Sequence, residues 1–285
     1  MVKTYYLLTK PGIIIGNLIT TASGFLLASK GHSKGHFDLW LFLATVIGLG
    51  SVIASACVCN NYIDRESDRK MERTKHRALA SGAISNKRAL FFAGCLGVLG
   101  GVILGLTTNF LSLLLASVGF FVYVGCYSLW KHHSSSATLV GSVAGAIPPV
   151  VGYCAVSGQF DMGASLFFLI LVLWQMPHFF AIALYRQREY ENASIPTMPS
   201  ERGIPATKRT MLAYIIAFLI ATALLLVFGY TGLSYLVVMS ILGLTWLGLS
   251  IRGFKREDHA AWARSMFRFS LVVIMGLSAM ISLGC

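Results

Sequence analysis

Polar and charged residues gather in one segment, residues 60–73, which directly continues a long apolar run. Within it Asn60, Asp64 and Asp68 recur every four residues. A helix places such residues in a row on one face, about 6 Å apart along its axis. One or two carboxylates, completed by phosphate oxygens and water, are the ligands that Mg²⁺ takes in proteins. The spacing therefore predicts a catalytic Mg²⁺ site at the end of this helix.

Basic residues surround this row of oxygen ligands. Arg65, Arg69 and Arg73 recur at the same spacing and are predicted to form a second row beside it. Guanidinium groups bind phosphate oxygens through paired hydrogen bonds. Carboxylate-held Mg²⁺ beside arginines, at a membrane boundary, predicts a binding site for a lipid diphosphate. The predicted phosphate contacts are Arg65, Lys70, Arg73 and Arg77.

The alternative for this segment is a solvated loop whose charges pair with one another and meet lipid headgroups. Basic loops at a membrane surface are ordinary, so the spacing alone does not decide between the two. The row that starts at Asn60 begins inside an apolar run, however, where an unpaired carboxylate is costly. This position favours the metal site.

Membrane helices must position these residues. Of the 285 residues, 56% are hydrophobic and only 12% are charged, about half the usual share, which excludes a soluble globular domain and a disordered chain. The net charge of +12 is a feature of many nucleic-acid binders, but so much apolar sequence excludes nucleic acid as the partner and indicates the lipid bilayer instead.

Seven runs without Asp, Glu, Lys or Arg divide the chain: residues 11–29, 39–63, 89–130, 132–160, 162–185, 210–251 and 269–285. A membrane helix needs about 20 apolar residues. The two runs of 42 residues therefore hold two helices each, with turns near 107–109 and 229–232. The sequence predicts an all-α, polytopic integral membrane protein with nine transmembrane helices, in which residues 1–285 form a single domain.

The charges fall almost entirely on one side of these predicted spans. Of the 23 Lys and Arg residues, 21 lie on the side of the N-terminus, and only Lys30 and Lys34 lie on the other. The positive-inside rule therefore predicts a cytoplasmic N-terminus. Nine of the eleven acidic residues lie on the same side. We expect a polar site that opens to the cytoplasm, for a substrate whose tail lies in lipid.

Several motifs together make the chain similar to one family of membrane enzymes. The row of Asn60, Asp64 and Asp68 is followed by R-T-x-x-R-x-L-x-S-G over residues 73–82, and this combination resembles the first signature of the UbiA-type membrane prenyltransferases. Four further stretches resemble the branch of that family that farnesylates haem: residues 10–13, 127–131, 141–152 and 174–178. The resemblance covers nearly the whole chain.

The resemblance implies nine helices around a central cavity that opens sideways to lipid. It implies that Mg²⁺ holds the diphosphate of farnesyl diphosphate, and that a vinyl group of haem b takes the farnesyl group, giving haem O once water has added. It further implies the cell (inner) membrane, with haem-handling or terminal oxidase assembly proteins as partners. When the C–O bond of farnesyl diphosphate breaks, the departing diphosphate needs strong stabilisation, which Mg²⁺ and arginines provide. The allylic cation left behind must be kept from water, which apolar cavity walls do. The predicted residues therefore suit the reaction that the resemblance implies.

The end of the sixth apolar run departs from many members of this family. In those members a second row of aspartates at this position completes a two-metal site. In this chain residues 185–192 read Y-R-Q-R-E-Y-E-N instead. Glu189 is the best acidic candidate for a further metal ligand. Arg186 and Arg188 are candidates for contact with the diphosphate or with a haem propionate. The haem branch looks similar here, which favours it over the quinone-type members.

Other residues have two open roles each. His178 is either a hydrogen-bonded core residue or a haem contact, because imidazole is the usual ligand of haem iron. Tyr127 and Lys131 share a helical face and either reach the diphosphate or meet lipid headgroups. Lys10 is either an orientation signal or a phosphate contact. His132, next to Lys131, is expected to be solvated.

Two rival functions are weighed against haem farnesylation. A quinone-type aromatic polyprenyltransferase is disfavoured because the second row of aspartates is missing. A membrane transporter of haem or of an anionic lipid would place ionisable groups near the bilayer midplane and would show an inverted repeat. The acidic residues lie at helix ends instead, which favours the enzyme.

Overall fold

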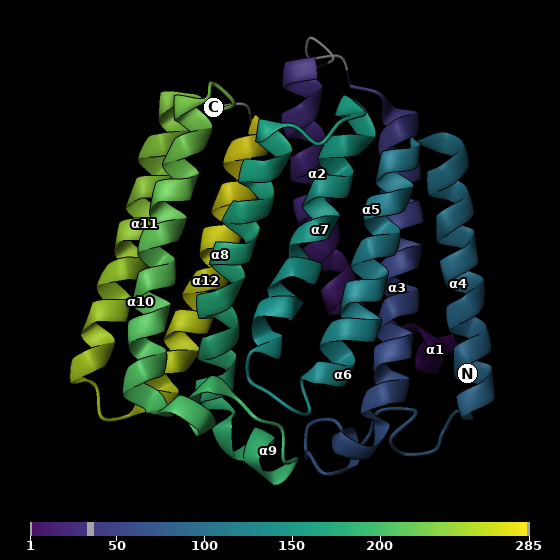
Figure 1. Cartoon of the computed structure of the whole chain (residues 1–285), viewed down its shortest axis with the longest axis vertical. Coiled ribbons are helices and arrows are strands. Elements are labelled where there is room, and N and C mark those ends of the chain that lie inside the picture. The colour runs from purple at the N-terminus through teal and green to yellow at the C-terminus, as the bar shows by residue number, and fades with distance from the viewer. Residues whose placement is uncertain (1, 33–36, 284–285) are drawn as a thin grey trace.

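The computed structural model describes residues 2–32 and 37–283, and within them every regular element is a helix (Figure 1). In chain order these are α1 (Val2–Leu8), α2 (Pro11–His32), α3 (Leu39–Arg69), α4 (Asn86–Thr107), α5 (Phe110–Phe121), the π-helical η1 (Val122–Tyr127), α6 (Ser128–Trp130), α7 (Ala137–Ser157), α8 (Met162–Tyr185), α9 (Gln187–Asn192), α10 (Met198–Val227), α11 (Leu233–Arg252), the 3-10 helical η2 (Gly253–Lys255) and α12 (His259–Leu283). Lys34, one of the two basic residues predicted on the far side, lies outside the described residues.

Within the described ranges, nine helical stretches are long and apolar enough to cross a membrane, as predicted. Both uncharged runs of 42 residues are divided where the sequence predicted a turn, because α4 ends at Thr107 and α10 ends at Val227. The Asn109 side chain caps the next helix by accepting a 2.8 Å hydrogen bond from the backbone of Ser112. The chain is a multi-pass membrane protein.

Helices α2 and α7 stand at the centre of the bundle, between α3, α4 and α5 on one side and α8, α10, α11 and α12 on the other (Figure 1). Glycines allow the two central helices to approach closely. A Cβ on Gly24 would lie 2.0 Å from the carbonyl oxygen of Pro149, and one on Gly152 would lie 2.2 Å from that of Thr21. Such close backbone contact is typical of membrane helix pairs, which lack a hydrophobic driving force between them.

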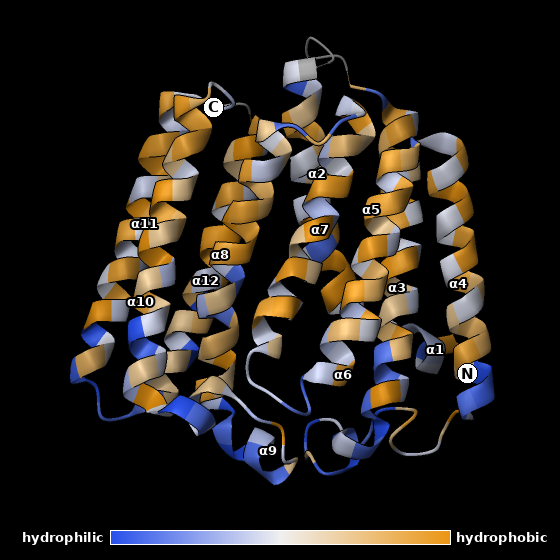
Figure 2. Cartoon of the chain, viewed as in Figure 1, coloured by the Kyte–Doolittle hydropathy of each residue, from blue (hydrophilic) through white to orange (hydrophobic). Residues whose placement is uncertain are grey.

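Apolar side chains cover the flanks of the bundle, and hydrophilic ones gather toward its ends (Figure 2). On the outer helices Phe91, Leu106 and Phe110 are each at least three-quarters exposed. Large apolar side chains in such positions are unfavourable in water and suit contact with lipid. The end that carries α9 and the turns after α3 is strongly hydrophilic, and the candidate site lies there (Figure 2).

The length of α3 explains how its polar row reaches this end. The helix has 31 residues, whereas the bilayer core needs about 20, so its last turns extend beyond the apolar window. Asn60, Asp64 and Asp68 are all in the helix, as predicted, and all three are buried. After Arg69 the chain leaves the helix through a series of turns that lead to α4, with Gly82 at a positive φ of 77°.

Candidate functional site

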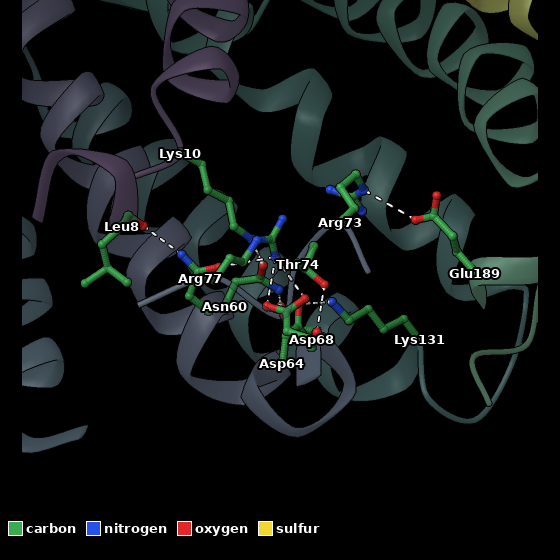
Figure 3. A network of polar contacts seen from close by, with 12 residues as sticks. Leu8, Lys10, Asn60, Asp64, Asp68, Arg73, Thr74, Arg77, Lys131 and Glu189 are labelled. Carbon is green, nitrogen blue, oxygen red and sulfur yellow. Dashed lines mark hydrogen bonds and ion pairs between the residues drawn. The ribbon is translucent and has the colours of Figure 1, made fainter. Parts of the chain in front are cut away.

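A cavity of about 270 Å³ opens among the ends of α3, α6 and α8 and the connections that follow them. Its polar lining comes from segments that lie far apart in the chain (Figure 3). The polar side chains that line it include Lys10, Asn60, Asp64, Asp68, Arg73, Arg77, Lys131 and Tyr190. Apolar and aromatic residues, mostly from η1, α8 and residues 195–198, line the rest of it. The cavity thus combines charged and apolar walls.

Asp68 is paired with Arg77. The Nη1 nitrogen of Arg77 donates to both carboxylate oxygens, at 3.0 and 2.9 Å, and the Asp68 side chain is only 3% exposed. The turns after α3 are held in place by the Thr74 hydroxyl, which donates to the backbone carbonyl of Asp68 at 3.0 Å. The chain therefore folds back over the end of α3, which places the Arg77 guanidinium against the Asp68 carboxylate.

Asp64 meets a cation from another part of the chain. The Lys131 ammonium, which follows α6, donates to Oδ2 of Asp64 at 2.5 Å. The other oxygen, Oδ1, lies 3.5 Å from Nε2 of His132 and is buried without a hydrogen-bond partner among the described residues. The His132 side chain lies against this carboxylate and is 28% exposed, so it is only partly solvated. This oxygen is open to a further donor, a water molecule or a bound cation.

Asn60 lies deepest in the row. Its Oδ1 accepts from the Lys10 ammonium, and its Nδ2 donates to the Ser128 hydroxyl at 2.8 Å. Lys10 stands between α1 and α2 with a positive φ of 54°, and its side chain extends toward the row (Figure 3). Burial, together with the nearby Arg77 guanidinium, lowers the pKa of the Lys10 ammonium to about 8.

Two tyrosines of the π-helical segment form an aromatic wall. Tyr123 and Tyr127 stack with their ring centroids 5.5 Å apart, and the Lys131 ammonium lies 5.3 Å from the Tyr127 ring. Both tyrosines line the cavity. The sequence analysis had selected Tyr127 but missed Tyr123, although the four-residue spacing between them was a usable signal. It also missed Tyr190, whose burial raises the pKa of its hydroxyl.

Several predicted site residues lie outside the cavity. Arg65 folds back onto Tyr62, donating to its carbonyl at 2.7 Å and lying 4.5 Å from its ring centroid. Lys70 and Arg188 are exposed and are not part of the cavity lining. The predicted row of Arg65, Arg69 and Arg73 was wrong, because α3 ends at Arg69 and Arg73 belongs to the turns beyond.

Glu189 is engaged by arginines rather than gathered with the aspartates. Both of its oxygens accept from Nη1 of Arg186 at 3.2 Å, and Oε2 lies 3.6 Å from Nε of Arg73 (Figure 3). Within the described residues, no three His, Cys, Asp or Glu side chains gather closely enough to hold a metal ion. The oxygen ligands that the structure does bring together are those of Asn60, Asp64 and Asp68.

His178 belongs to α8, faces α12 and does not line the cavity. Its Nδ1 is 2.7 Å from the Ser270 hydroxyl, and its ring packs against those of Trp174 and Phe267, each with a centroid distance of 4.9 Å. The Trp174 indole donates to the backbone carbonyl of Ser270 at 2.8 Å. His178 is thus a hydrogen-bonded member of an aromatic cluster next to the cavity wall.

Comparison with known proteins decides the family. The model of the UbiA prenyltransferase family matches residues 17–272. The chain belongs to the UbiA prenyltransferase family. Protoheme IX farnesyltransferase of Protochlamydia amoebophila is 51% identical over 278 residues, which cover 98% of this chain and 97% of that protein. The protein of the same name from Edwardsiella ictaluri is 50% identical over 284 residues, which cover 99% of this chain and 95% of that protein.

Solved UbiA structures share the fold at low sequence identity. A digeranylgeranylglyceryl phosphate synthase superposes with a TM-score of 0.82 at 19% identity, covering 99% of this chain and 98% of that chain. A UbiA homolog from Archaeoglobus fulgidus, bound to DMAPP and Mg²⁺, superposes with a TM-score of 0.70 at 16% identity. The match covers 98% of this chain and 99% of that chain. The predicted UbiA fold is confirmed. So is the predicted branch, because relatives at half identity across nearly the whole chain are protoheme IX farnesyltransferases.

Proposed function

We propose that this protein transfers the farnesyl group of farnesyl diphosphate to a vinyl group of haem b (protohaem IX), giving haem O. The observation that carries this proposal is the identity of about half of all residues, over nearly the full length, with protoheme IX farnesyltransferases. The cavity supports it independently. Charged walls beside apolar ones suit a substrate that has a phosphate head and a hydrocarbon tail.

The charge of the cavity lining favours a diphosphate. Four basic side chains line it, against only the two carboxylates of Asp64 and Asp68. This excess of positive charge attracts an anion, and burial strengthens the attraction because the local dielectric is low. The phosphate-binding residues that we propose are Lys10, Arg73, Arg77 and Lys131. Arg65 and Lys70, predicted from the sequence, could join them only if their side chains leave their present positions.

Asn60, Asp64 and Asp68 fit a divalent cation and are the residues that would hold Mg²⁺. Two buried carboxylates and an amide oxygen are hard oxygen ligands, and one oxygen of Asp64 lacks a hydrogen-bond donor. When bound, Mg²⁺ would neutralise the diphosphate and make it a better leaving group. The A. fulgidus homolog bound to Mg²⁺ and DMAPP is consistent with this assignment. Glu189 would join the ligands only after releasing Arg73 and Arg186.

The aromatic wall suits the reacting end of the farnesyl chain. As the C–O bond to the diphosphate breaks, positive charge develops on the allylic carbon, and the faces of Tyr123 and Tyr127 can stabilise that charge. The apolar residues of α8 that line the cavity would keep water away from it until the new bond has formed. We propose that His178 contacts the haem acceptor, and that Arg186 and Arg188 neutralise its propionates.

We propose that the site faces the cytoplasm and that the protein resides in the cell (inner) membrane. Of the 23 Lys and Arg residues, 21 fall on the side that carries the site, which is the distribution that membrane insertion retains inside. Haem-handling and terminal oxidase assembly proteins would be its partners, since they supply the acceptor and use the product. The whole chain would act as a single domain.

The test is to incubate the purified protein with haem b, farnesyl diphosphate and Mg²⁺, and to analyse the extracted haem by mass spectrometry. We expect farnesylated haem from the wild type and none above background from Asp64→Asn or Asp68→Asn. Full activity in either variant would contradict the metal site. Prenylation of a quinone precursor offered in parallel, with haem left unmodified, would contradict the acceptor.

A further inference from the structure

A second concave surface lies on the outside of the bundle, between α1 and the first turns of α4. This groove has a volume of about 520 Å³, and its lining is Tyr5, Lys87, Arg88, Phe91, Phe92 and Cys95. The site described above does not use it. Tyr5 closes one wall by packing edge-on against Phe92, with ring centroids 5.0 Å apart. A buried apolar cluster that includes Leu8 and Ala93 supports the groove from beneath.

The groove is charged at one end and apolar along its length. Lys87, Phe91 and Cys95 follow one another at intervals of four residues, so they lie along a single face of α4. Lys87 and Arg88 occupy the first turn of the helix, and both side chains are exposed. Neither side chain has an ion pair or hydrogen bond to any described residue. Two cations therefore stand unneutralised above an apolar channel.

The face that carries the groove is one that meets lipid. On its inner side α4 packs against α3, where a Cβ on Gly100 would lie 2.5 Å from the carbonyl oxygen of Gly48. On its outer side α4 exposes Phe91, Val98 and Leu106, and it stands at the edge of the bundle (Figure 1). The groove therefore opens on the outer side of α4, with Lys87 at one end and Phe91 along its length.

We propose that this groove binds an anionic phospholipid, with the headgroup phosphate held by Lys87 and Arg88 and an acyl chain lying against Phe91 and Cys95. The argument is charge complementarity, since the two free cations match an anionic head and the apolar channel matches its chain. A zwitterionic lipid would bring its own positive charge to the same two residues, and free phosphate would leave the apolar part of the groove unfilled.

Lipid bound here holds α1 against the bundle. This short helix exposes Val2, Tyr6 and Leu7 on its outer side. Its attachments to the bundle include the Tyr5 ring and the 2.8 Å hydrogen bond from Nδ2 of Asn61 to the carbonyl oxygen of Leu8. A lipid in the groove adds contacts to this small interface. The proposal therefore predicts that anionic lipid orders α1.

The experiment measures lipid binding and α1 order, and neither readout uses prenyl transfer. The full-length protein in detergent is titrated with phosphatidylglycerol or phosphatidylcholine and observed by native mass spectrometry. We expect phosphatidylglycerol to bind preferentially, and the double variant Lys87→Gln/Arg88→Gln to bind it about twenty-five-fold more weakly, at about a factor of five for each basic residue. Lys255→Gln/Arg256→Gln, an exposed basic pair after α11, is the matched control and should leave binding unchanged.

Cys95→Trp fills the apolar end of the groove without changing its charge and should also weaken binding. In hydrogen exchange, the backbone amides of α1 should be better protected in phosphatidylglycerol nanodiscs than in phosphatidylcholine nanodiscs, and the double variant should lose this difference. Equal loss of binding in the Lys87/Arg88 and Lys255/Arg256 variants would reduce the effect to general attraction of headgroups and overturn the proposal. So would undiminished binding in Cys95→Trp.

Discussion

Replacing Arg77 with Met leaves the Asp68 carboxylate buried without its counter-ion. Removing one partner of a buried ion pair costs about 3–5 kcal/mol, because the remaining charge cannot return to water. Asp68 is 3% exposed, whereas Arg77 is 29% exposed and partly screened by solvent. We therefore take the lower limit, about 3 kcal/mol. For a chain of this size that corresponds to a decrease of about 6–12 °C in the thermal midpoint.

The assay is thermal unfolding of the purified protein in detergent, without and with Mg²⁺. Lys75→Met is the matched control in the same turns, because it removes a pair with Glu72 whose side chains are 40% and 86% exposed, and this should change the midpoint little. Adding Asp68→Asn to Arg77→Met removes the buried charge and should restore most of the lost stability. Mg²⁺ should stabilise Arg77→Met more than it stabilises the double variant, which lacks the carboxylate.

An Arg77→Met midpoint within about 2 °C of the wild type would mean a cost below about 1 kcal/mol, which a buried unpaired carboxylate does not permit. A failure of Asp68→Asn to restore stability would show that Arg77 stabilises the turns by packing rather than by charge. Equal stabilisation of the single and double variants by Mg²⁺ would remove Asp68 from the proposed metal site. Each of these results refutes a separate step of the reasoning.

Three further predictions concern other parts of the molecule. Gly24→Ala should destabilise the protein by about 1–3 kcal/mol or prevent folding, because its Cβ would meet the carbonyl of Pro149. Gly16→Ala in the same helix should be tolerated, because nothing lies within 4 Å of the added Cβ, and thermal unfolding distinguishes the two variants. Lys131→Met should tighten Mg²⁺ binding in the absence of substrate, because it frees the Asp64 carboxylate. It should weaken farnesyl diphosphate binding, because it removes a proposed phosphate contact. Calorimetry measures both affinities, and a change of both in the same direction would contradict the prediction. His178→Ala should weaken haem b binding, followed by absorption spectroscopy, while farnesyl diphosphate binding is kept; unchanged haem affinity would exclude the proposed contact.

The membrane architecture could be predicted because the bilayer imposes strong local rules. A chain crossing hydrocarbon must satisfy its backbone hydrogen bonds within each helix, so length and hydropathy suffice to locate the spans. The breaks at Thr107 and Val227 appear in the sequence as short polar or glycine-containing turns between apolar stretches. The continuation of α3 through Asn60, Asp64 and Asp68 follows from the same helical periodicity.

The partners of those three residues could not be predicted, because they come from distant parts of the chain. Lys10 reaches Asn60 across 50 residues, and Lys131 reaches Asp64 across 67. The row expected to include Arg73 failed because α3 stops one turn earlier, and the energy gained by folding Arg77 back onto Asp68 is a tertiary term that periodicity does not contain.

The amino-acid sequence by itself determined that this is a membrane protein, whose described residues hold nine apolar spans, that its polar residues gather at one end, and that three oxygen ligands share a helical face. These properties depend on neighbours within a few turns of one helix. Only the tertiary structure decided which cations neutralise Asp64 and Asp68, that Tyr123 joins Tyr127 in the wall, and that Glu189 is paired with Arg73 and Arg186. The physical reason is that a charge buried in a low-dielectric site needs an oppositely charged neighbour. That neighbour can come from a distant part of the chain, so only the packing of the helices determines which residue it is.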